Sequence, residues 1–454
     1  MKIDITKNNL FLEGIDELAN WEADNKGIQK IKVLLKSYLE LDNVSFLFGA
    51  GSSMNIGSVS IANVPKKIED AIKVAEVDIS GTPTPDVLYE EFIEIVRGLQ
   101  GENPEKRNGK SEIQYSLEKL LNYLVAQEYI LDIYPDAVKH KHLLYLIRTI
   151  KKGLFELCDI ENLPNPAWLD GEEKTNLDKN KSYYHEKFTK KILQRPLNLK
   201  RANVFTTNYD LAFEYAFDKL GVNFISGFSG FQKRTFKPEA FEYDLFFPGS
   251  TTQGRVQRIE KVLRYYKIHG SLTWVKEQPS ENNVYGISEV PIEIVRQHKD
   301  YTNIMIYPTT AKKSFTLDFP YSELFRQFSA SISQPQSVLV TFGYSFSDEH
   351  INDIIYQALT IPSFTLIVVD FNGTNEKEAD NINKEILKLK DLKDPRVIIL
   401  QGLQLGSFSF FVEQLLPDLI EVNTYEKIAE TLKTLFGKYD ITTIPVTPPI
   451  PPVL

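Results

Sequence analysis

The stretch FLFGAGSS at Phe46–Ser53 decides the fold that we expect for this chain of 454 residues. A short apolar run, which favours a buried strand, ends on glycines and two serines. A strand that enters a glycine-rich turn is the phosphate-binding connection of many α/β folds, because glycine lets the backbone approach a pyrophosphate closely. A β-branched residue at Gly51 would occupy that space and resist a positive φ. A tight strand-to-helix turn without a ligand has the same composition.

Three further segments place polar residues after β-prone runs. They are VFTTNYD at Val204–Asp210, YKIHGS at Tyr266–Ser271 and VTFGYSFSDEH at Val340–His350. A parallel sheet presents its chemistry at the carboxyl ends of its strands. We therefore expect all four segments to meet at one edge of one sheet.

The periodicity of the chain predicts an α/β fold, Rossmann-like, with a mostly parallel sheet and a large helical insertion after the first strand. After the second strand, the runs alternate with helical stretches, which is the βαβ rhythm of a parallel sheet. Strand-like runs occur at Val44–Phe48, Asn203–Thr206, Val262–Ile268, Asn303–Tyr307, Ser337–Phe342, Phe364–Asp370 and Arg396–Leu400.

These patterns divide the chain into three parts. We expect a helical lead-in at 1–42, a nucleotide-binding domain at 43–420 and a C-terminal helix with a proline-rich arm at 421–454. The helical insertion occupies about 58–200 and covers or flanks the site. The aromatic-rich segment Phe224–Phe247 fits a hairpin or a lid.

Composition narrows the classes of function. The formal net charge of -9 disfavours direct binding of nucleic acid. The apolar runs are shorter than a membrane span, and MKIDITKNN lacks the apolar run of a signal peptide, so we expect a cytoplasmic protein without membrane contact. The single cysteine, Cys158, can make neither an internal disulfide nor a zinc site built from thiolates, and its apolar surroundings predict an inert thiol.

The order of the four segments resembles the sirtuin superfamily. It is most similar to the sirtuin-like NAD hydrolases of bacterial antiphage systems, of the type paired with a HerA-like ATPase. Gly49–Ser53 matches the sirtuin pattern Gly-Ala-Gly-x-Ser, and VFTTNYD resembles Thr-Gln-Asn-Ile-Asp with Thr207 and Tyr209 substituted. The chain departs from the deacylating branch at MNIGSVSIANVP, which replaces Ile-Pro-Asp-Phe-Arg, and it lacks the cysteines of that branch's zinc ribbon.

The resemblance implies roles for individual residues. Asn208 would position the ribose and the attacking water, Asp210 would hold nearby hydroxyls or orient Asn208, and His269 would accept a proton. The residues implied to contact NAD are Gly49, Ala50, Gly51, Ser52, Ser53, Thr206, Gly343, Ser345 and Asp370.

Each polar residue also has a structural alternative. Asn208 or Asp210 could cap the helix expected at Leu211–Leu220, and a histidine at the end of a strand can simply be hydrogen-bonded. Asp370 could form the turn that follows it, and Ser347 or Asp348 could cap the next helix. Adjacent residues on a helix do not share a face, so Asp348-Glu349-His350 does not predict a metal site and we expect no metal.

The family chemistry is cleavage of the bond between nicotinamide and ribose in NAD, which is the substrate. Without a zinc ribbon to wall the peptide cleft, water is the expected acceptor, and the products are nicotinamide and ADP-ribose. The alternatives are an NAD-dependent protein deacylase or ADP-ribosyltransferase, and a non-catalytic nucleotide-binding assembly subunit. Family analogy implies a homo-oligomer, a HerA-like ATPase partner and a role in abortive infection.

Overall fold

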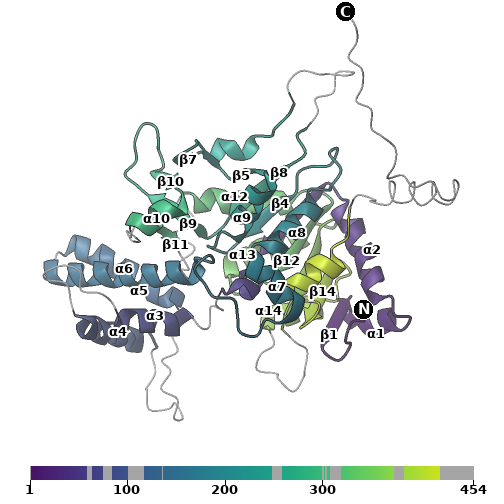
Figure 1. Ribbon diagram of the computed structural model, residues 1–454, viewed down its shortest axis with the longest axis horizontal. Coiled ribbons are helices and arrows are strands. Elements are labelled where there is room, and N and C mark those ends of the chain that lie inside the picture. The colour runs from purple at the N-terminus through teal and green to yellow at the C-terminus, as the bar shows by residue number, and fades with distance from the viewer. Residues whose placement is uncertain are drawn as a thin grey trace, which may run out of the picture.

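The computed structural model of this protein describes residues 2–58, 64–74, 84–100, 117–134, 136–247, 258–298, 301, 304–306, 319–372 and 383–419. A nine-stranded sheet forms its centre, in the order β2-β1-β14-β13-β12-β3-β4-β8-β5 (Figure 1). The strands from β14 to β5 are parallel, which confirms the predicted α/β class. The nine strands are Asn8–Leu12 (β1), Ile15–Asp16 (β2), Asn43–Phe48 (β3), Asn203–Thr206 (β4), Asn223–Ile225 (β5), Val262–Lys267 (β8), Ser337–Phe342 (β12), Thr365–Asp370 (β13) and Val397–Gly402 (β14).

The strand order reverses between β3 and β12. From β3 the chain adds β4 and β8 on one side, and it returns to add β12, β13 and β14 on the other. In open α/β sheets, such a reversal leaves a crevice beyond the carboxyl ends of the two strands, where ligands bind. The two glycine turns, after Phe48 and after Phe342, are located at this crevice.

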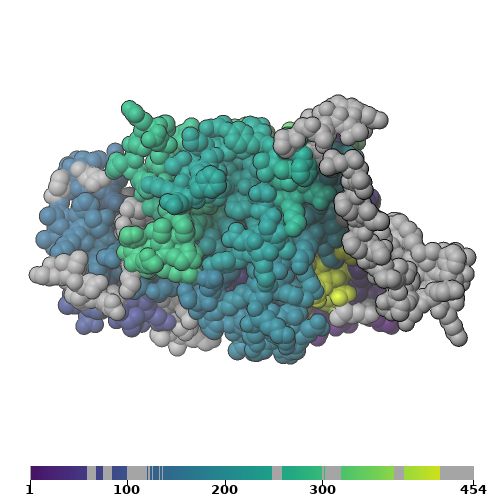
Figure 2. All heavy atoms as spheres, turned by 45° about the horizontal axis from the view of Figure 1, so that its top comes forward, coloured from purple at the N-terminus to yellow at the C-terminus, as the bar shows by residue number. Residues whose placement is uncertain are grey.

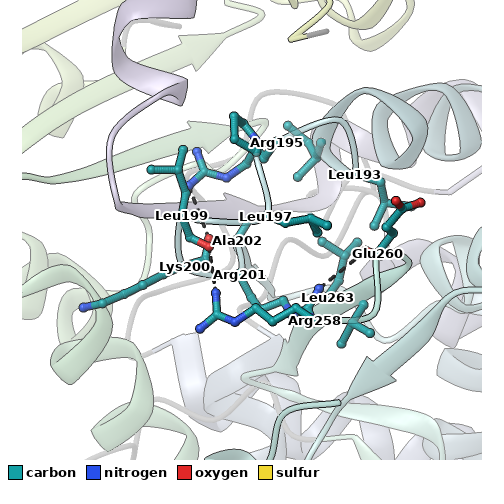
Figure 3. Close-up of a pocket in the computed structure, with 13 residues that line it drawn as sticks. Leu193, Arg195, Leu197, Leu199, Lys200, Arg201, Ala202, Arg258, Glu260 and Leu263 are labelled. Atoms are coloured by element: carbon teal, nitrogen blue, oxygen red, sulfur yellow. Dashed lines mark hydrogen bonds between the residues drawn. The ribbon is translucent and has the colours of Figure 1, made fainter. Parts of the chain in front are cut away.

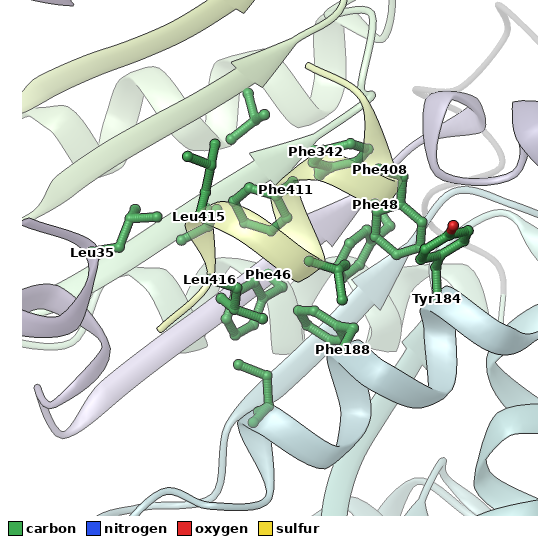
Figure 4. Packing of buried hydrophobic residues seen from close by; sticks show 14 of the residues in the cluster. Leu35, Phe46, Phe48, Tyr184, Phe188, Phe342, Phe408, Phe411, Leu415 and Leu416 are labelled. Atoms are coloured by element: carbon green, nitrogen blue, oxygen red, sulfur yellow. The ribbon is translucent and has the colours of Figure 1, made fainter. Parts of the chain in front are cut away.

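Helices cover both faces of the sheet because its buried strands alternate side chains between two cores. Phe46 and Phe48 point into one core, and Leu47 into the other. Figure 4 shows the first core, where Phe188 packs edge-on against Phe46 and Phe48 at 5.0 and 4.9 Å. The helices on that face are α2 (Gly27–Leu39), α8 (Tyr183–Ile192), α9 (Ala212–Leu220), α15 (Phe408–Phe410) and η8 (Phe411–Leu415); those on the other are α12 (Tyr321–Ile332), α13 (Glu349–Leu359) and α14 (Lys384–Asp391).

A second, antiparallel sheet differs from the prediction. Its order is β11-β9-β10-β7-β6. The run predicted at Asn303–Tyr307 is β11, which pairs with β9 here and not with the parallel sheet. The hairpin expected within Phe224–Phe247 is present as β6 paired with β7. The bounds are Phe228–Ser229 (β6), Arg234–Phe236 (β7), Gly270–Lys276 (β9), Ile287–Glu289 (β10) and Ile304–Ile306 (β11), with α10 at Ile292–His298 and a short 3-10 turn at Pro238–Glu242.

The predicted helical insertion is present between β3 and β4, but its helices belong to two different hydrophobic cores. Its first helices share a separate core, whereas Tyr184, Phe188 and Ile192 of α8 belong to the core of the main sheet. Helix α8, within the predicted bounds of about 58–200, therefore packs against the main sheet. The helices that precede α8 in the insertion are α3 (Val64–Lys73), α4 (Pro85–Gln100), α5 (Leu117–Ile133) and α6 (Ala137–Cys158), followed by α7 (Gly171–Lys179).

The insertion forms one end of the molecule beside the second sheet (Figures 1 and 2). Its core includes Leu272 of β9 and Ile292 and Val295 of α10. Arg296 of α10 also pairs with Asp159, just after α6, at 2.5 Å. Packing and an ion pair thus join the insertion to the segment that follows His269.

The lead-in at 1–42 is not only helical. It holds α1 (Leu18–Glu22) and α2, but β1 also pairs with β14 and extends the main sheet. Leu10 of this strand packs into one core and Phe11 into the other, and burial on both faces stabilises the strand there. The C-terminal helix and arm predicted at 421–454 lie outside the described residues. No helix in the described ranges has the length and apolar character to cross a membrane.

Candidate functional site

The two glycine turns touch each other at the crevice. The N–H of Gly49 donates to Phe342 O at 2.9 Å, and that of Gly51 donates to Gly343 O at 3.0 Å. A Cβ on Gly51 would lie 2.5 Å from Gly343 Cα. Of these glycines, Gly343 alone has a left-handed φ, of +57°.

This contact corrects the reason expected for Gly51. The residue is not in the left-handed region, and a side chain there would meet the backbone of Gly343 first. Gly51→Val therefore tests the packing of the two turns, not the binding of a pyrophosphate. Ala50 and Gly51 are themselves only partly buried.

Asn208 is hydrogen-bonded to the first glycine turn. Its Nδ2 donates to Ser52 Oγ at 3.2 Å and to Ser53 Oγ at 3.1 Å. Both serines are fully buried, whereas Asn208 is half-exposed. The serine hydroxyls therefore orient Asn208 from behind, and the binding role predicted for them stays a prediction.

Thr206 positions the same asparagine from its own strand. Its Oγ1 donates to Phe48 O at 3.2 Å and accepts the N–H of Asn208 at 3.0 Å. Thr206 is buried, so its hydroxyl is committed to these two groups. It joins β3, β4 and Asn208, and the direct contact with NAD implied for it also remains a prediction.

His269 lies on the neighbouring strand end. The N–H of Ile268 donates to Thr206 O at 2.8 Å, so the segments that carry Asn208 and His269 run side by side. His269 Nε2 is 2.9 Å from Asp348 Oδ2, and the histidine side chain is 16% exposed. A neutral imidazole that donates Nε2–H to the carboxylate keeps Nδ1 as a proton acceptor.

Asp348 has a second partner, which the sequence did predict. Its Oδ1 accepts the N–H groups of His350 and Ile351 and thereby caps α13. The predicted cap is confirmed, whereas the contact with His269 was missed. The two residues are 79 positions apart, and nothing in the local pattern of either one indicates the other.

A buried ion pair lies behind the loop that carries Asn208, and the sequence did not predict it. Lys267 Nζ is 2.9 Å from Glu214 Oε1, and it donates to the carbonyls of Tyr209 and Asp210. Lys267 is 2% exposed, and burial raises the pKa of Glu214 above its usual value. A lysine inside the apolar run VLRYYKIHG was the available sign, because such a lysine needs buried partners.

Asp210 comes just before Leu211, the N-cap residue of α9, and is not itself the cap. Its Oδ1 accepts the N–H of Ala212 at 3.0 Å, at the start of α9. This bond is the short-range one expected of an aspartate before a helix. The catalytic role implied for Asp210 stays a prediction.

Ser345 and Asp370 lie at the same edge. Ser345 is exposed, with its Oγ 2.9 Å from Ser347 Oγ. Asp370 ends β13, is buried, and accepts hydrogen bonds from Gln401 at 3.2 Å and Asn372 at 3.4 Å. Burial raises the pKa of Asp370. The bond to Asn372 fits the turn-forming alternative, and contacts of either residue with NAD remain predictions.

Two further expectations concern metals and thiols. Across the described residues, no group of three or more His, Cys, Asp or Glu side chains is arranged to hold a metal ion. Burial raises the pKa of the Cys158 thiol to about 12, so the thiol stays protonated and unreactive near neutral pH.

Comparison with known protein families finds a match for the central part of the chain. Residues 202–390 match the SIR2-like domain family. The match includes the segments of Asn208, His269 and Gly343, while the first glycine turn precedes it. No curated protein matches the chain.

Proposed function

We propose that the chain hydrolyses NAD at the bond between nicotinamide and ribose, giving nicotinamide and ADP-ribose. SIR2-like domains are typically NAD-dependent enzymes. The observation that carries the proposal is the pairing of two oriented groups at the switch point. Asn208 is held by the serines of one glycine turn, and His269 is held by Asp348 beyond the other.

Hydrolysis of NAD requires one group that positions the ribose and the water and another that accepts a proton. The C–N bond to nicotinamide breaks with its electron pair going to the leaving ring, through an oxocarbenium-like state. Water then forms the new bond to the ribose carbon and gives up a proton. Asn208, with an amide fixed by two hydroxyls, orients ribose and water, and His269 Nδ1 accepts the proton. The glycine turn at Ala50 and Gly51, whose residues are partly buried, would contact the phosphates.

The test is turnover by the purified full-length protein. We expect nicotinamide and ADP-ribose to form in equal amounts from NAD, measured by chromatography. Asn208→Ala and His269→Ala should each lower the rate by about a hundredfold or more, because each removes a positioning or acid–base group. His298→Ala, which changes an exposed histidine on α10, is the matched control and should leave the rate unchanged.

Two outcomes would contradict the proposal. If a folded Asn208→Ala or His269→Ala variant keeps near-normal turnover, the role assigned to that residue is wrong. If nicotinamide is released only when an acyl-lysine peptide is added, the protein is a deacylase, and transfer of ADP-ribose to protein would make it a transferase. Binding of NAD without turnover would indicate that the protein is a non-catalytic nucleotide-binding assembly subunit.

We also propose that this hydrolysis serves antiphage defence by abortive infection, with assembly into a homo-oligomer and a HerA-like ATPase as partner. The support is the resemblance of the four ordered motifs to the sirtuin-like subunits of such systems. NAD measured in infected cells is the test. We expect it to fall in cells with the wild-type protein and to persist in cells with His269→Ala.

A further inference from the structure

A second polar cleft lies at the opposite edge of the main sheet, at the amino ends of β3, β4 and β8. Its volume is about 430 Å³, which is in the range of small-molecule sites. Polar side chains make most of its wall. The lining consists of Asn43, Lys200, Arg201, Asn203, Glu242, Asp244, Arg258, Arg264, Tyr266, Arg326, Gln327, Ala330, Ser331 and Gln334.

The cleft is cationic although the chain is acidic overall. Five cationic side chains and two carboxylates line it, in a protein with a formal net charge of -9. Two of the arginines share one carboxylate, because Asp244 pairs with Arg201 at 2.9 Å and with Arg258 at 3.4 Å. One acid thus serves two guanidinium groups.

Two other cations of the cleft bind only neutral groups in the described part of the chain. Lys200 Nζ is 3.0 Å from Asn43 Oδ1, and the side chain is exposed. Arg264 donates to the carbonyls of Phe241 and Tyr243. Carbonyl and amide oxygens satisfy donors without cancelling charge, so the positive potential at both residues persists.

A buried arginine extends this positive region behind the cleft. Arg195 lines a smaller cavity that shares Lys200, Arg201 and Arg258 with the cleft (Figure 3). It is 7% exposed, its guanidinium donates to the carbonyls of Leu39 and Leu41, and its Nε has no partner among the described residues. Burial lowers the pKa of Arg195 to about 10, so it stays charged at neutral pH. Carbonyl oxygens satisfy the terminal N–H groups of Arg195 without cancelling its charge, so the residue adds positive potential behind the cleft.

We propose that this cleft binds a small molecule that carries phosphate groups, such as a nucleotide or pyrophosphate. Arginine and lysine are the side chains that bind phosphate oxygens best, because their charged N–H groups match the oxygens of a phosphate. The acidic chain as a whole disfavours a long polyanion such as nucleic acid, so the ligand is small. The site is separate from the crevice at the carboxyl edge and does not depend on NAD hydrolysis.

The test is calorimetric titration of the full-length protein with inorganic pyrophosphate, and separately with ADP-ribose. Lys200→Gln should weaken the affinity for pyrophosphate about tenfold, as loss of one charge-assisted hydrogen bond implies, and Lys200→Arg should keep it. Arg258→Gln should act like Lys200→Gln. Lys30→Gln removes a partly exposed lysine on α2, away from the cleft, and should change nothing. Added sodium chloride should weaken binding in the wild type.

Asn208→Ala distinguishes the two edges of the sheet, because pyrophosphate could also bind at the glycine turns. Affinity that survives Asn208→Ala but falls in Lys200→Gln supports the cleft. Affinity that falls only in Asn208→Ala, or wild-type protein that does not bind pyrophosphate, overturns the proposal. Thermal unfolding without ligand checks that each variant is folded. ADP-ribose is also the product expected in the crevice, so it is compared with pyrophosphate through the affinity lost in Lys200→Gln. A larger loss for ADP-ribose would assign the cleft to nucleotides, and an equal loss would assign it to the phosphates alone.

Discussion

Asp348 uses one carboxylate for two tasks. One oxygen caps α13, and the other holds His269 at 2.9 Å. The two tasks can be separated by chemistry, because asparagine caps a helix as well as aspartate does but carries no negative charge to pair with the Nε2–H of His269. The pair therefore offers a test of positioning that does not depend on unfolding the helix.

We predict that Asp348→Asn lowers NAD turnover about tenfold or more while the melting temperature stays close to that of the wild type. Loss of the carboxylate removes the group that selects the Nε2–H tautomer of His269. Asp348→Ala is the comparison, and it should also cost about 1 kcal/mol of stability through loss of the cap. Unchanged turnover in a folded Asp348→Asn variant would exclude the positioning role.

At the scale of elements, α8 carries a histidine into the core of the main sheet. His185 packs between the rings of Phe213 and Phe408, with centroids 4.8 and 4.9 Å away. Neither ring nitrogen has a hydrogen-bond partner among the described residues. Burial lowers the pKa of His185 to about 4, from an ordinary value near 6.5.

The sign of the resulting pH dependence follows from this shift. The unfolded chain binds a proton at His185 below about pH 6.5, whereas the folded chain does not until about pH 4, so stability is lost as the pH falls through this window. We predict a loss of about 2 kcal/mol between pH 7 and pH 5 from this group, measured by urea unfolding. His185→Leu should flatten the slope, and His140→Leu, on α6, should not. An equal slope in wild type and His185→Leu would contradict the assignment.

Two other elements, β8 and α9, are joined by Lys267 and Glu214. The lysine also holds the carbonyls of Tyr209 and Asp210, so the pair fixes the loop of Asn208 relative to the strand of His269. Removing one partner leaves the other charge buried, which costs more than removing both.

We predict that Lys267→Met lowers the free energy of unfolding by about 3 kcal/mol or more. Lys267→Met combined with Glu214→Leu should lose less than the single variant. Lys261→Met, at the exposed position just before β8, is the matched control and should be near neutral. The measurement is urea unfolding of all four proteins, and a double variant less stable than Lys267→Met would show that the pair is not coupled in this way.

At the scale of the whole molecule, the insertion is packed against the site. Its core includes Leu211 and Leu272, and Tyr209 is packed against it, next to Asn208 and near His269. A shift of α3–α6 would therefore move residues adjacent to both candidate catalytic groups. A change in the population of such states is a physical route from a partner to the site.

We predict low NAD hydrolysis by the isolated protomer and a large rise on assembly. Hydrogen exchange should change more in α4–α6 than in Ser337–Leu400, because a partner would act through the insertion. The measurements are turnover against protein concentration and exchange mass spectrometry before and after assembly. Full activity in a dilute, verified monomer would contradict this mechanism of regulation.

The sequence by itself determined the strands of the main sheet and the edge where its polar residues gather. Buried parallel strands are short apolar runs, and this local property placed β4 and β12 at their observed residues. The glycine turns after Phe48 and Phe342 could also be predicted from the local sequence. The sequence also indicated the insertion, through the helical periodicity that separates the first two strands.

Tertiary structure alone decided which side chains meet. The antiparallel pairing of β1 with β14 joins the two ends of the described chain, and β11 belongs to the second sheet because β9 lies beside it. The contacts of Asp348 with His269 and of Lys267 with Glu214 join residues 79 and 53 positions apart. Local patterns record whether a side chain is buried, but its partner is chosen by the packing of strands and helices, and that packing is a property of the whole fold.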